Sequence, residues 1–185
     1  MQILGRIGLA ICWLAWWYPF LFRAPHVQKR ASITVIGPTR VGLLLESSAI
    51  CMAFVFRLPP ESPPGVARVL PSLILGPAAV VMAWTAVAHL GRQFRIHAGL
   101  YLDHELVRTG PYAIVRHPIY ASLLAMLVCS LLVMTPWPWA AAALALFVLG
   151  TEIRVRTEDK LLESRFGEGA RQYQKAVRAY VPFVR

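Results

Sequence analysis

The chain has 185 residues, of which 57% are hydrophobic and 15% charged, and its formal net charge is +10. Soluble domains average about 25% charged residues, so this composition excludes an ordinary soluble fold and favours a polytopic membrane protein. The positive charge predicts topological bias and contact with anionic membrane lipid. It is not accompanied by a basic module typical of nucleic-acid binding, so we expect no nucleic-acid partner.

The first apolar segment covers residues 3–22. Arg6 before an apolar run resembles the start of a signal peptide. The run is long, rich in tryptophan and without a small-residue cleavage site, so we expect a membrane span. Four more spans follow from the hydrophobic pattern, at 41–58, 70–90, 118–134 and 137–153. The last two are joined by TPWPW, which predicts a tight antiparallel hairpin.

Two polar side chains fall within the second and third spans. Glu46 is a functional candidate by default, because an acid is costly inside a membrane, but pairing with Arg40 is an equal alternative. For His89, a histidine satisfied between helices is favoured over a ligand-binding one. The three cysteines are spread over separate apolar spans, so we interpret them as small apolar residues and predict no metal site.

Basic residues are concentrated on one side of the five-span arrangement. Segments 23–40, 91–117 and 151–185 share that side and hold sixteen of the nineteen lysines and arginines, leaving Arg6, Arg57 and Arg68 opposite. The positive-inside rule makes the basic side cytoplasmic, with the N-terminus outside and the C-terminus inside.

The expected fold class is all-α: a polytopic integral membrane bundle of about five transmembrane helices with a C-terminal cytoplasmic helical cap. We predict a single membrane domain over 1–185, with three N-terminal spans in 1–90 and a cofactor-binding core in 91–185. The core comprises a cytoplasmic loop at 91–117, the last two spans, and C-terminal helices over 154–181, broken at Gly167 and Gly169. A polar loop of this length is more often functional than a simple connector.

The sequence GPYAIVRHPIY, at 110–120, places Arg116 and His117 directly before Pro118, which suits the first turn of a helix. Free backbone N–H groups and the helix dipole favour an anion at such a position, and a guanidinium can hold it bidentately. Contact of Arg116 with lipid phosphate is the equally weighted alternative.

Glu158 and Asp159 are adjacent acids just beyond the last span, and Arg154 lies four residues before Glu158. A solvated charged face with i,i+4 ion pairs is the commoner explanation of such a run. Alternatively, one carboxylate binds the ammonium group of a ligand. Together with an anion site near Arg116, this second interpretation predicts a zwitterionic, amino-acid-like cofactor.

The runs HELVRTGPYAIVRHPIYASLL and RVRTEDKLLESRFGEGARQYQKAVRAYVPF resemble the isoprenylcysteine carboxyl methyltransferase family, which is related to phospholipid N-methyltransferases. The family pattern is His-x-Leu-Val-x-x-Gly-x-Tyr, then Arg-His-Pro-x-Tyr, and finally Arg-x-x-x-Glu-Glu-x-x-Leu-x-x-x-Phe-Gly. The resemblance covers residues 104–183. It implies a methyltransferase of the bacterial inner membrane that uses S-adenosyl-L-methionine and methylates a lipophilic carboxylate, thiol or amine.

The same resemblance implies roles for individual residues. Arg116 would hold the carboxylate end of the cofactor, Glu158 its ammonium group, and Arg154 would face the methyl acceptor, which makes these three the implied catalytic residues. Asp159 stands where the family has a second glutamate, Ser122 replaces a common glycine and Ala170 a tyrosine. The full implied set of cofactor contacts is His104, Leu106, Val107, Gly110, Tyr112, Arg116, His117, Tyr120, Glu158 and Asp159.

Two other functions remain open at this stage. Membrane ene and sterol reductases, which use NADPH, share a related C-terminal architecture but are usually larger. A non-catalytic membrane scaffold that retains the pocket is the third alternative. The sequence identifies neither the methyl acceptor nor the oligomeric state.

Overall fold

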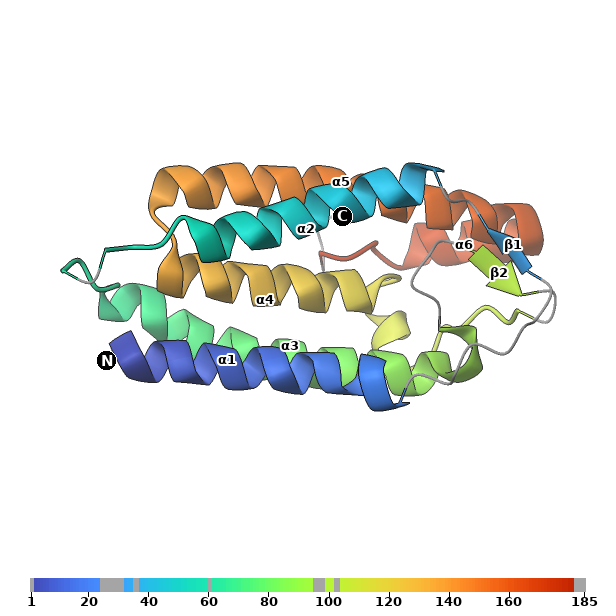
Figure 1. Ribbon diagram of the computed structural model, residues 1–185. Coiled ribbons are helices and arrows are strands. Elements are labelled where there is room, and N and C mark those ends of the chain that lie inside the picture. Colours follow the sequence, from blue (N-terminus) through green and yellow to red (C-terminus); the bar gives the residue numbers. More distant parts are fainter. Residues whose placement is uncertain are drawn as a thin grey trace.

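The computed structural model describes residues 2–23, 32–34, 37–59, 61–94, 99–101 and 104–181. Long helices run side by side along one axis to form an all-α bundle (Figure 1). Four of them are long and apolar enough to cross a membrane, and α4, with 17 residues, is somewhat shorter. The long helices are α1 (Gln2–Tyr18, extended by a π-helical turn at Pro19–Arg23), α2 (Gly37–Val55), α3 (Val66–Leu90), α4 (Pro118–Met134) and α5 (Trp137–Phe166).

The C-terminal part differs from the expectation in one boundary. We expected the last span to end at residue 153 and a separate helix to begin at 154, but α5 continues without a break to Phe166. No glycine or proline interrupts it between Gly150 and Gly167, and it ends where Gly167 adopts a left-handed φ of +54°. The predicted break thus falls at Gly167 alone, because Gly169 lies within the short helix α6 (Glu168–Ala176) that follows, and this helix ends before the predicted residue 181.

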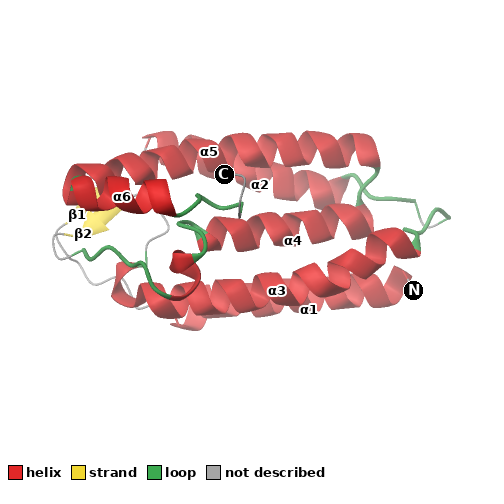
Figure 2. Cartoon of the chain, turned by 180° about the vertical axis from the view of Figure 1, so that it is seen from behind, coloured by secondary structure: helices red, strands yellow, loops and turns green. Residues whose placement is uncertain are grey.

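A small β-ribbon, which the sequence did not predict, lies at one end of the bundle. Strand β1 (Ser32–Thr34) pairs antiparallel with β2 (Gly99–Tyr101), with Ile33 opposite Leu100. Short 3-10 turns at Gly91–Gln93 and Gly110–Ala113 accompany it in the polar loop. Seen from behind, the ribbon lies beside α6 (Figure 2).

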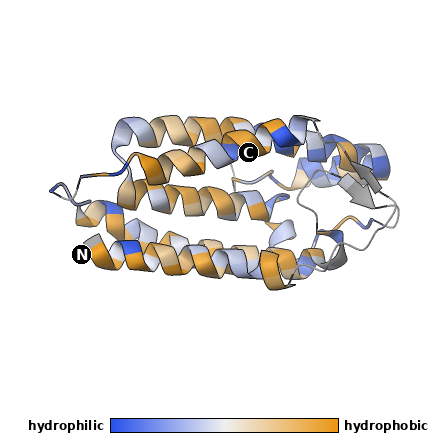
Figure 3. Cartoon of the chain, in the orientation of Figure 1, coloured by the Kyte–Doolittle hydropathy of each residue, from blue (hydrophilic) through white to orange (hydrophobic). Residues whose placement is uncertain are grey.

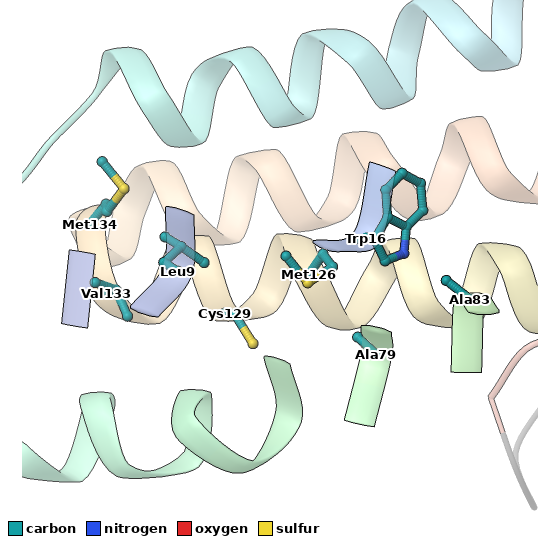
Figure 4. Close-up of a cluster of buried hydrophobic side chains, with 8 residues drawn as sticks. All are labelled: Leu9, Trp16, Ala79, Ala83, Met126, Cys129, Val133 and Met134. Atoms are coloured by element: carbon teal, nitrogen blue, oxygen red, sulfur yellow. The ribbon is translucent and has the colours of Figure 1, made fainter. Parts of the chain in front are cut away.

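Helix α4 lies between the pair α1–α3 and the pair α2–α5 (Figure 1). Two apolar clusters meet along it, and small residues in both let the helices approach closely. The cluster toward α1 and α3 contains Leu9, Trp16, Ala79, Ala83, Met126, Cys129, Val133 and Met134 (Figure 4). The cluster toward α2 and α5 contains Ala49, Ala53, Leu127, Leu131, Ala140, Ala143 and Phe147.

Polar side chains inside the bundle have partners on neighbouring helices. The indole nitrogen of Trp13 donates to Ser130 Oγ at 3.0 Å, and that of Trp16 donates to Ser122 Oγ at 3.0 Å. Because lipid offers no hydrogen bonds, such internal pairing is needed. Ser122, which replaces a common family glycine, thus fastens α4 to α1.

Arg68 completes the C-terminal end of α4. Its Nε and Nη2 donate to the carbonyls of Leu132 and Leu131, both at 2.8 Å, and its guanidinium lies 4.4 Å from the centroid of the Trp137 ring. A helix of 17 residues is about 25 Å long, so its last carbonyls end within the bundle and need donors from elsewhere. A cation also interacts favourably with this end of a helix dipole.

Polar residues gather at the end of the bundle that carries the ribbon and α6. The parts of the long helices away from this end are largely hydrophobic (Figure 3). The N-terminus, the loop between α2 and α3, and the turn between α4 and α5 lie at the opposite end (Figure 1). The predicted spans thus bring the basic loop and the C-terminal region to one end. Which membrane face this end occupies stays a prediction.

The closest approach of α2 and α5 generates the first testable prediction. A Cβ atom at Gly42 would lie 2.4 Å from Arg154 Cγ and 2.7 Å from the Gly150 carbonyl oxygen. We expect Gly42→Ala to lower the free energy of unfolding by roughly 1–3 kcal/mol, because this packed backbone cannot yield. Thermal unfolding in detergent measures the effect.

The control is Gly8→Ala in α1, where a Cβ atom would have no heavy atom within 4 Å. This change should be neutral or slightly stabilising, because alanine favours a helix more than glycine does. Equal melting temperatures for the two variants would contradict the tight α2–α5 contact.

Candidate functional site

A cavity of about 360 Å³ lies at the polar end of the bundle. This volume falls within the range of small-molecule sites. Its wall is formed by residues of α1, α2, α4, α5 and α6, the end of α3 and the polar loop that follows α3. The sequence-predicted residues in the wall are His104, Leu106, Val107, Tyr112, Arg116, His117, Tyr120, Arg154 and Glu158.

Two predicted residues, Gly110 and Asp159, do not line this cavity, although both support residues that do. The wall also contains residues outside the predicted set. These come mainly from α1, α2, the end of α3 and α6, and include Trp16, Trp17, Phe20, Glu46, Gln93, Leu161, Leu162 and Tyr173.

His117 connects the start of α4 to both adjacent acids of α5. Its Nε2 lies 3.0 Å from Asp159 Oδ1, and its Nδ1 lies 3.3 Å from Glu158 Oε2. Burial opposes the charged imidazole, but the hydrogen bonds to Asp159 and Glu158 outweigh it and raise the pKa of His117 to about 9. His117 is therefore an imidazolium at neutral pH, and each of its ring N–H groups donates a hydrogen bond to one of the two acids.

Arg116 is held by the chain itself. Its Nη2 lies 2.7 Å from Asp159 Oδ2, and its Nη1 donates to the backbone carbonyls of Gln174, at 3.0 Å, and Val177. A carboxylate of α5 is thus the anion that the structure places beside Arg116, and contact with lipid phosphate stays an untested alternative. The predicted contact between Arg116 and a cofactor carboxylate stays a prediction.

The C-terminal strap, residues 177–181, passes between α4 and α5 (Figure 2). The backbone N–H of Arg116 donates to the Arg178 carbonyl at 2.8 Å, and that of His117 donates to the Ala179 carbonyl at 2.7 Å. The Tyr180 hydroxyl donates to Glu152 Oε1 at 2.9 Å. These bonds fix the strap to the segment that carries the site.

Helix α6 is fastened by Tyr173, whose hydroxyl donates to the Tyr112 carbonyl at 2.6 Å. Burial raises the pKa of Tyr173 to about 12, so its hydroxyl remains a donor at neutral pH. Burial also raises the pKa of Tyr112 well above its ordinary value. Both aromatic rings lie in the cavity wall as neutral groups.

A second polar cluster joins α2 and α5 at the cavity wall. Arg154 Nη1 lies 2.7 Å from Glu46 Oε2, and the Thr151 hydroxyl donates to Glu46 Oε1 at 2.9 Å. The Arg154 guanidinium lies 4.8 Å from the centroid of the Tyr120 ring, and the Tyr120 hydroxyl donates to Glu158. Glu46 thus pairs with Arg154, and the alternative of pairing with Arg40 is wrong.

Gly110 supports the cavity from outside. Its φ is +59°, and a Cβ atom there would lie 2.4 to 2.6 Å from three ring atoms of His89. The other side of that ring is held by its own helix, since His89 Nδ1 lies 2.8 Å from the Thr85 carbonyl oxygen. His89 therefore acts as a packing surface for the loop.

Gln93 is the wall residue that sequence reasoning had least chance of finding. It follows α3 directly, is 8% exposed, and its Oε1 has no hydrogen-bond partner within the described part of the chain. Leaving a buried acceptor unpaired costs about 1–3 kcal/mol, which a ligand N–H or O–H would recover. By contrast, the aromatic spacing of Trp16, Trp17 and Phe20 was a visible signal in the first span.

These features define a membrane-embedded helical bundle whose polar end encloses a small-molecule site. The profile of the isoprenylcysteine carboxyl methyltransferase (ICMT) family matches residues 72–164, half of the chain, and the chain belongs to that family. Membership indicates a membrane methyltransferase. Most of the cavity wall lies within the matched residues, but Trp16, Trp17, Phe20 and Glu46 precede them.

A metal-resistance protein is also similar to this chain. The cobalt-zinc-cadmium resistance protein CzcN of Cupriavidus metallidurans is 36% identical over 112 residues, which cover 57% of this chain and 44% of that protein. The chain thus spans less than half the length of this relative.

The raised pKa of His117 predicts how stability depends on pH. Because the folded-state pKa is about 9 and the unfolded value about 6.5, the stabilisation is fully present below pH 6.5 and is lost as the pH rises through 9. Its size is on the order of 3 kcal/mol. The melting temperature in detergent should fall over this interval, and His117→Gln should flatten the profile.

His89→Gln is the matched control, because His89 is an exposed histidine without acidic partners among the described residues. It should keep the wild-type pH profile. A profile that stays steep in His117→Gln would mean that another group titrates.

Gly110→Ala should unfold at a lower temperature than wild type, since it adds backbone strain and a collision with the His89 ring. Gly91→Ala separates the two effects: Gly91 has a similar φ of +50°, but a Cβ atom there would have no heavy atom within 4 Å. We expect the backbone strain to lower the free energy of unfolding of both variants by roughly 1–3 kcal/mol. The collision with His89 should lower it further in Gly110→Ala only. Equal losses in thermal unfolding would argue against the contact with His89.

Proposed function

We propose that the protein is an S-adenosyl-L-methionine-dependent methyltransferase that acts on a lipophilic acceptor. The observation that carries the proposal is one continuous cavity with two kinds of wall. Part of its lining is polar and includes Glu158, His117 and Arg116. Another part is apolar and includes Trp16, Phe20 and further side chains of the long apolar helices.

The residues present fit the cofactor. The Glu158 side chain is 25% exposed, and although Tyr120 and His117 bond its oxygens, a carboxylate has about four acceptor positions and can take an ammonium as well. Arg116 has five N–H donors, and its four recorded contacts leave one for a ligand carboxylate. The unpaired Gln93 oxygen offers an acceptor to another donor of the ligand.

When bound, S-adenosyl-L-methionine supplies an electrophilic methyl group on a sulfonium. The chain contributes orientation, which can lower such a barrier by roughly 7–11 kcal/mol, and the strap and α6 exclude water. His117 holds its proton at neutral pH and cannot serve as a base there. A carboxylate acceptor is already ionised and needs no base, whereas an amine acceptor would need one, for which Glu158 and Asp159 remain the candidates.

The aromatic part of the cavity lining supports a lipophilic acceptor. Trp16, Trp17 and Phe20 come from α1, and Ile50 comes from α2, both helices long enough to span the membrane. An apolar acceptor bound there would place its polar head near Arg154. By the positive-inside rule we further propose that the cavity faces the cytoplasm of an inner membrane, with the N-terminus outside.

Titration of the purified protein in lipid nanodiscs tests the cofactor. We expect S-adenosyl-L-methionine and S-adenosylhomocysteine to bind and NADPH not to bind. Glu158→Gln should weaken binding of the first roughly 10- to 100-fold, because a hydrogen bond to a charged group is lost. Glu163→Gln, on the same helix but outside the cavity wall, should leave affinity unchanged.

The outcomes separate the alternatives. Preference for NADPH would select the reductase, and no binding of any of the three would select the non-catalytic scaffold.

A second experiment identifies the acceptor: the protein is incubated with methyl-labelled cofactor and total membrane lipid. Label confined to small soluble thiols would overturn the lipophilic acceptor while leaving the cofactor intact.

A further inference from the structure

Glu46 lies outside the family-matched residues, yet it is 1% exposed in the middle of α2, a helix apolar enough to cross a membrane. An ionised acid at this depth is costly, and replacing a buried ion pair by apolar side chains is often neutral or stabilising. Stability alone therefore does not account for the Glu46–Arg154 pair. Both residues line the cavity, which indicates a role there.

The geometry around Arg154 indicates what that role is. Arg154 and Glu158 are four residues apart on α5, the spacing at which a helical arginine and glutamate ordinarily pair. Arg154 instead turns to α2, where its Nη1 lies 2.7 Å from Glu46 Oε2. Glu158 is left to accept from the Tyr120 hydroxyl and to face His117 at 3.3 Å.

A glycine in α2 leaves the space that Arg154 needs to reach Glu46. The stem of Arg154 passes over Gly42, where a Cβ atom would lie 2.4 Å from Arg154 Cγ and 3.1 Å from its Cδ. Thr151, one turn before Arg154, fixes the other carboxylate oxygen of Glu46 at 2.9 Å. The Tyr120 ring, 4.8 Å from the guanidinium, supports the diverted arginine through a cation–π contact.

We propose that Glu46 is a positioning residue that draws Arg154 away from Glu158 and so keeps the Glu158 carboxylate available to the cofactor ammonium. The inference rests on the proposed function. Without Glu46, the arginine has Glu158 as its nearest helical partner, and it competes there with the positively charged group of the ligand. Glu46 thus acts on cofactor affinity through Arg154 and touches no cofactor atom itself.

The decisive experiment compares three variants in nanodiscs by calorimetric titration with S-adenosyl-L-methionine. Glu46→Gln should weaken binding roughly 10- to 100-fold, the effect of losing one charge-assisted hydrogen bond. The double variant Glu46→Gln with Arg154→Gln should regain most of the lost affinity, because the competing cation is gone. Glu163→Gln, on the same helix as Arg154 but outside the cavity wall, is the control and should leave the affinity unchanged.

Rescue distinguishes positioning from a structural role. If Glu46 only stabilised the α2–α5 contact, Glu46→Gln would lower the melting temperature without weakening binding, or the double variant would bind no better than the single one. Either result overturns the proposal. Should Glu46→Gln fail to fold, Glu46→Asp replaces it; its shorter carboxylate holds Arg154 less firmly and should give a smaller, equally rescuable loss.

A measurement without ligand keeps this inference separate from the proposed function. If Arg154 turns to Glu158 when Glu46 is neutralised, Glu158→Gln will lower the melting temperature more in the Glu46→Gln background than in wild type. Equal shifts in the two backgrounds would contradict the diversion of Arg154. Absence of cofactor binding to wild type would contradict the proposed function and leave this thermal comparison valid.

Discussion

The imidazolium of His117, bonded to two adjacent acids, is the interaction on which the site depends. Neighbouring residues of a helix point about 100° apart. The side chains of Glu158 and Asp159 can therefore reach one ring only if that ring lies between them, at the end of a neighbouring helix. His117, directly before α4, provides that end. Helix α5 has 30 residues and is about 45 Å long, so it extends past the beginning of α4. Both acids therefore lie where they can meet His117.

The two acids have separate tasks because their surroundings differ. Asp159 bonds Arg116 and His117 and lies behind the cavity wall, so it fastens the strap and α6 to α5 through Arg116. Glu158 is directed into the cavity, with its oxygens toward Tyr120 and His117. An aspartate in place of the second family glutamate is thus compatible with the fold, because a side chain as short as aspartate already reaches Arg116 and His117 from this position.

Local patterns predicted the helices well, and they predicted the pairing inside the cavity poorly. Apolar length located the spans, and Pro118 located the start of α4, because these are properties of short segments. The Glu46–Arg154 pair joins residues 108 positions apart, whereas the helical spacing rule favoured Arg154 with Glu158. Likewise, the local pattern did not predict that Asp159, 43 residues away, pairs with Arg116, and the expected ligand anion stays a prediction.

Charge balance around the cavity connects the site to its proposed ligands. Apart from the exposed Glu105, the ionised groups of the wall and its supports balance among the residues described: Arg116, His117 and Arg154 are matched by Glu46, Glu158 and Asp159. A net charge enclosed in a medium of low dielectric constant is expensive. S-adenosyl-L-methionine carries one net positive charge, from its sulfonium, ammonium and carboxylate. An anionic acceptor would balance this positive charge before methyl transfer. The transfer would then convert the sulfonium into a neutral thioether and the anionic acceptor into a neutral methylated product. The arrangement therefore favours a reaction that destroys one positive and one negative charge within the enclosed cavity.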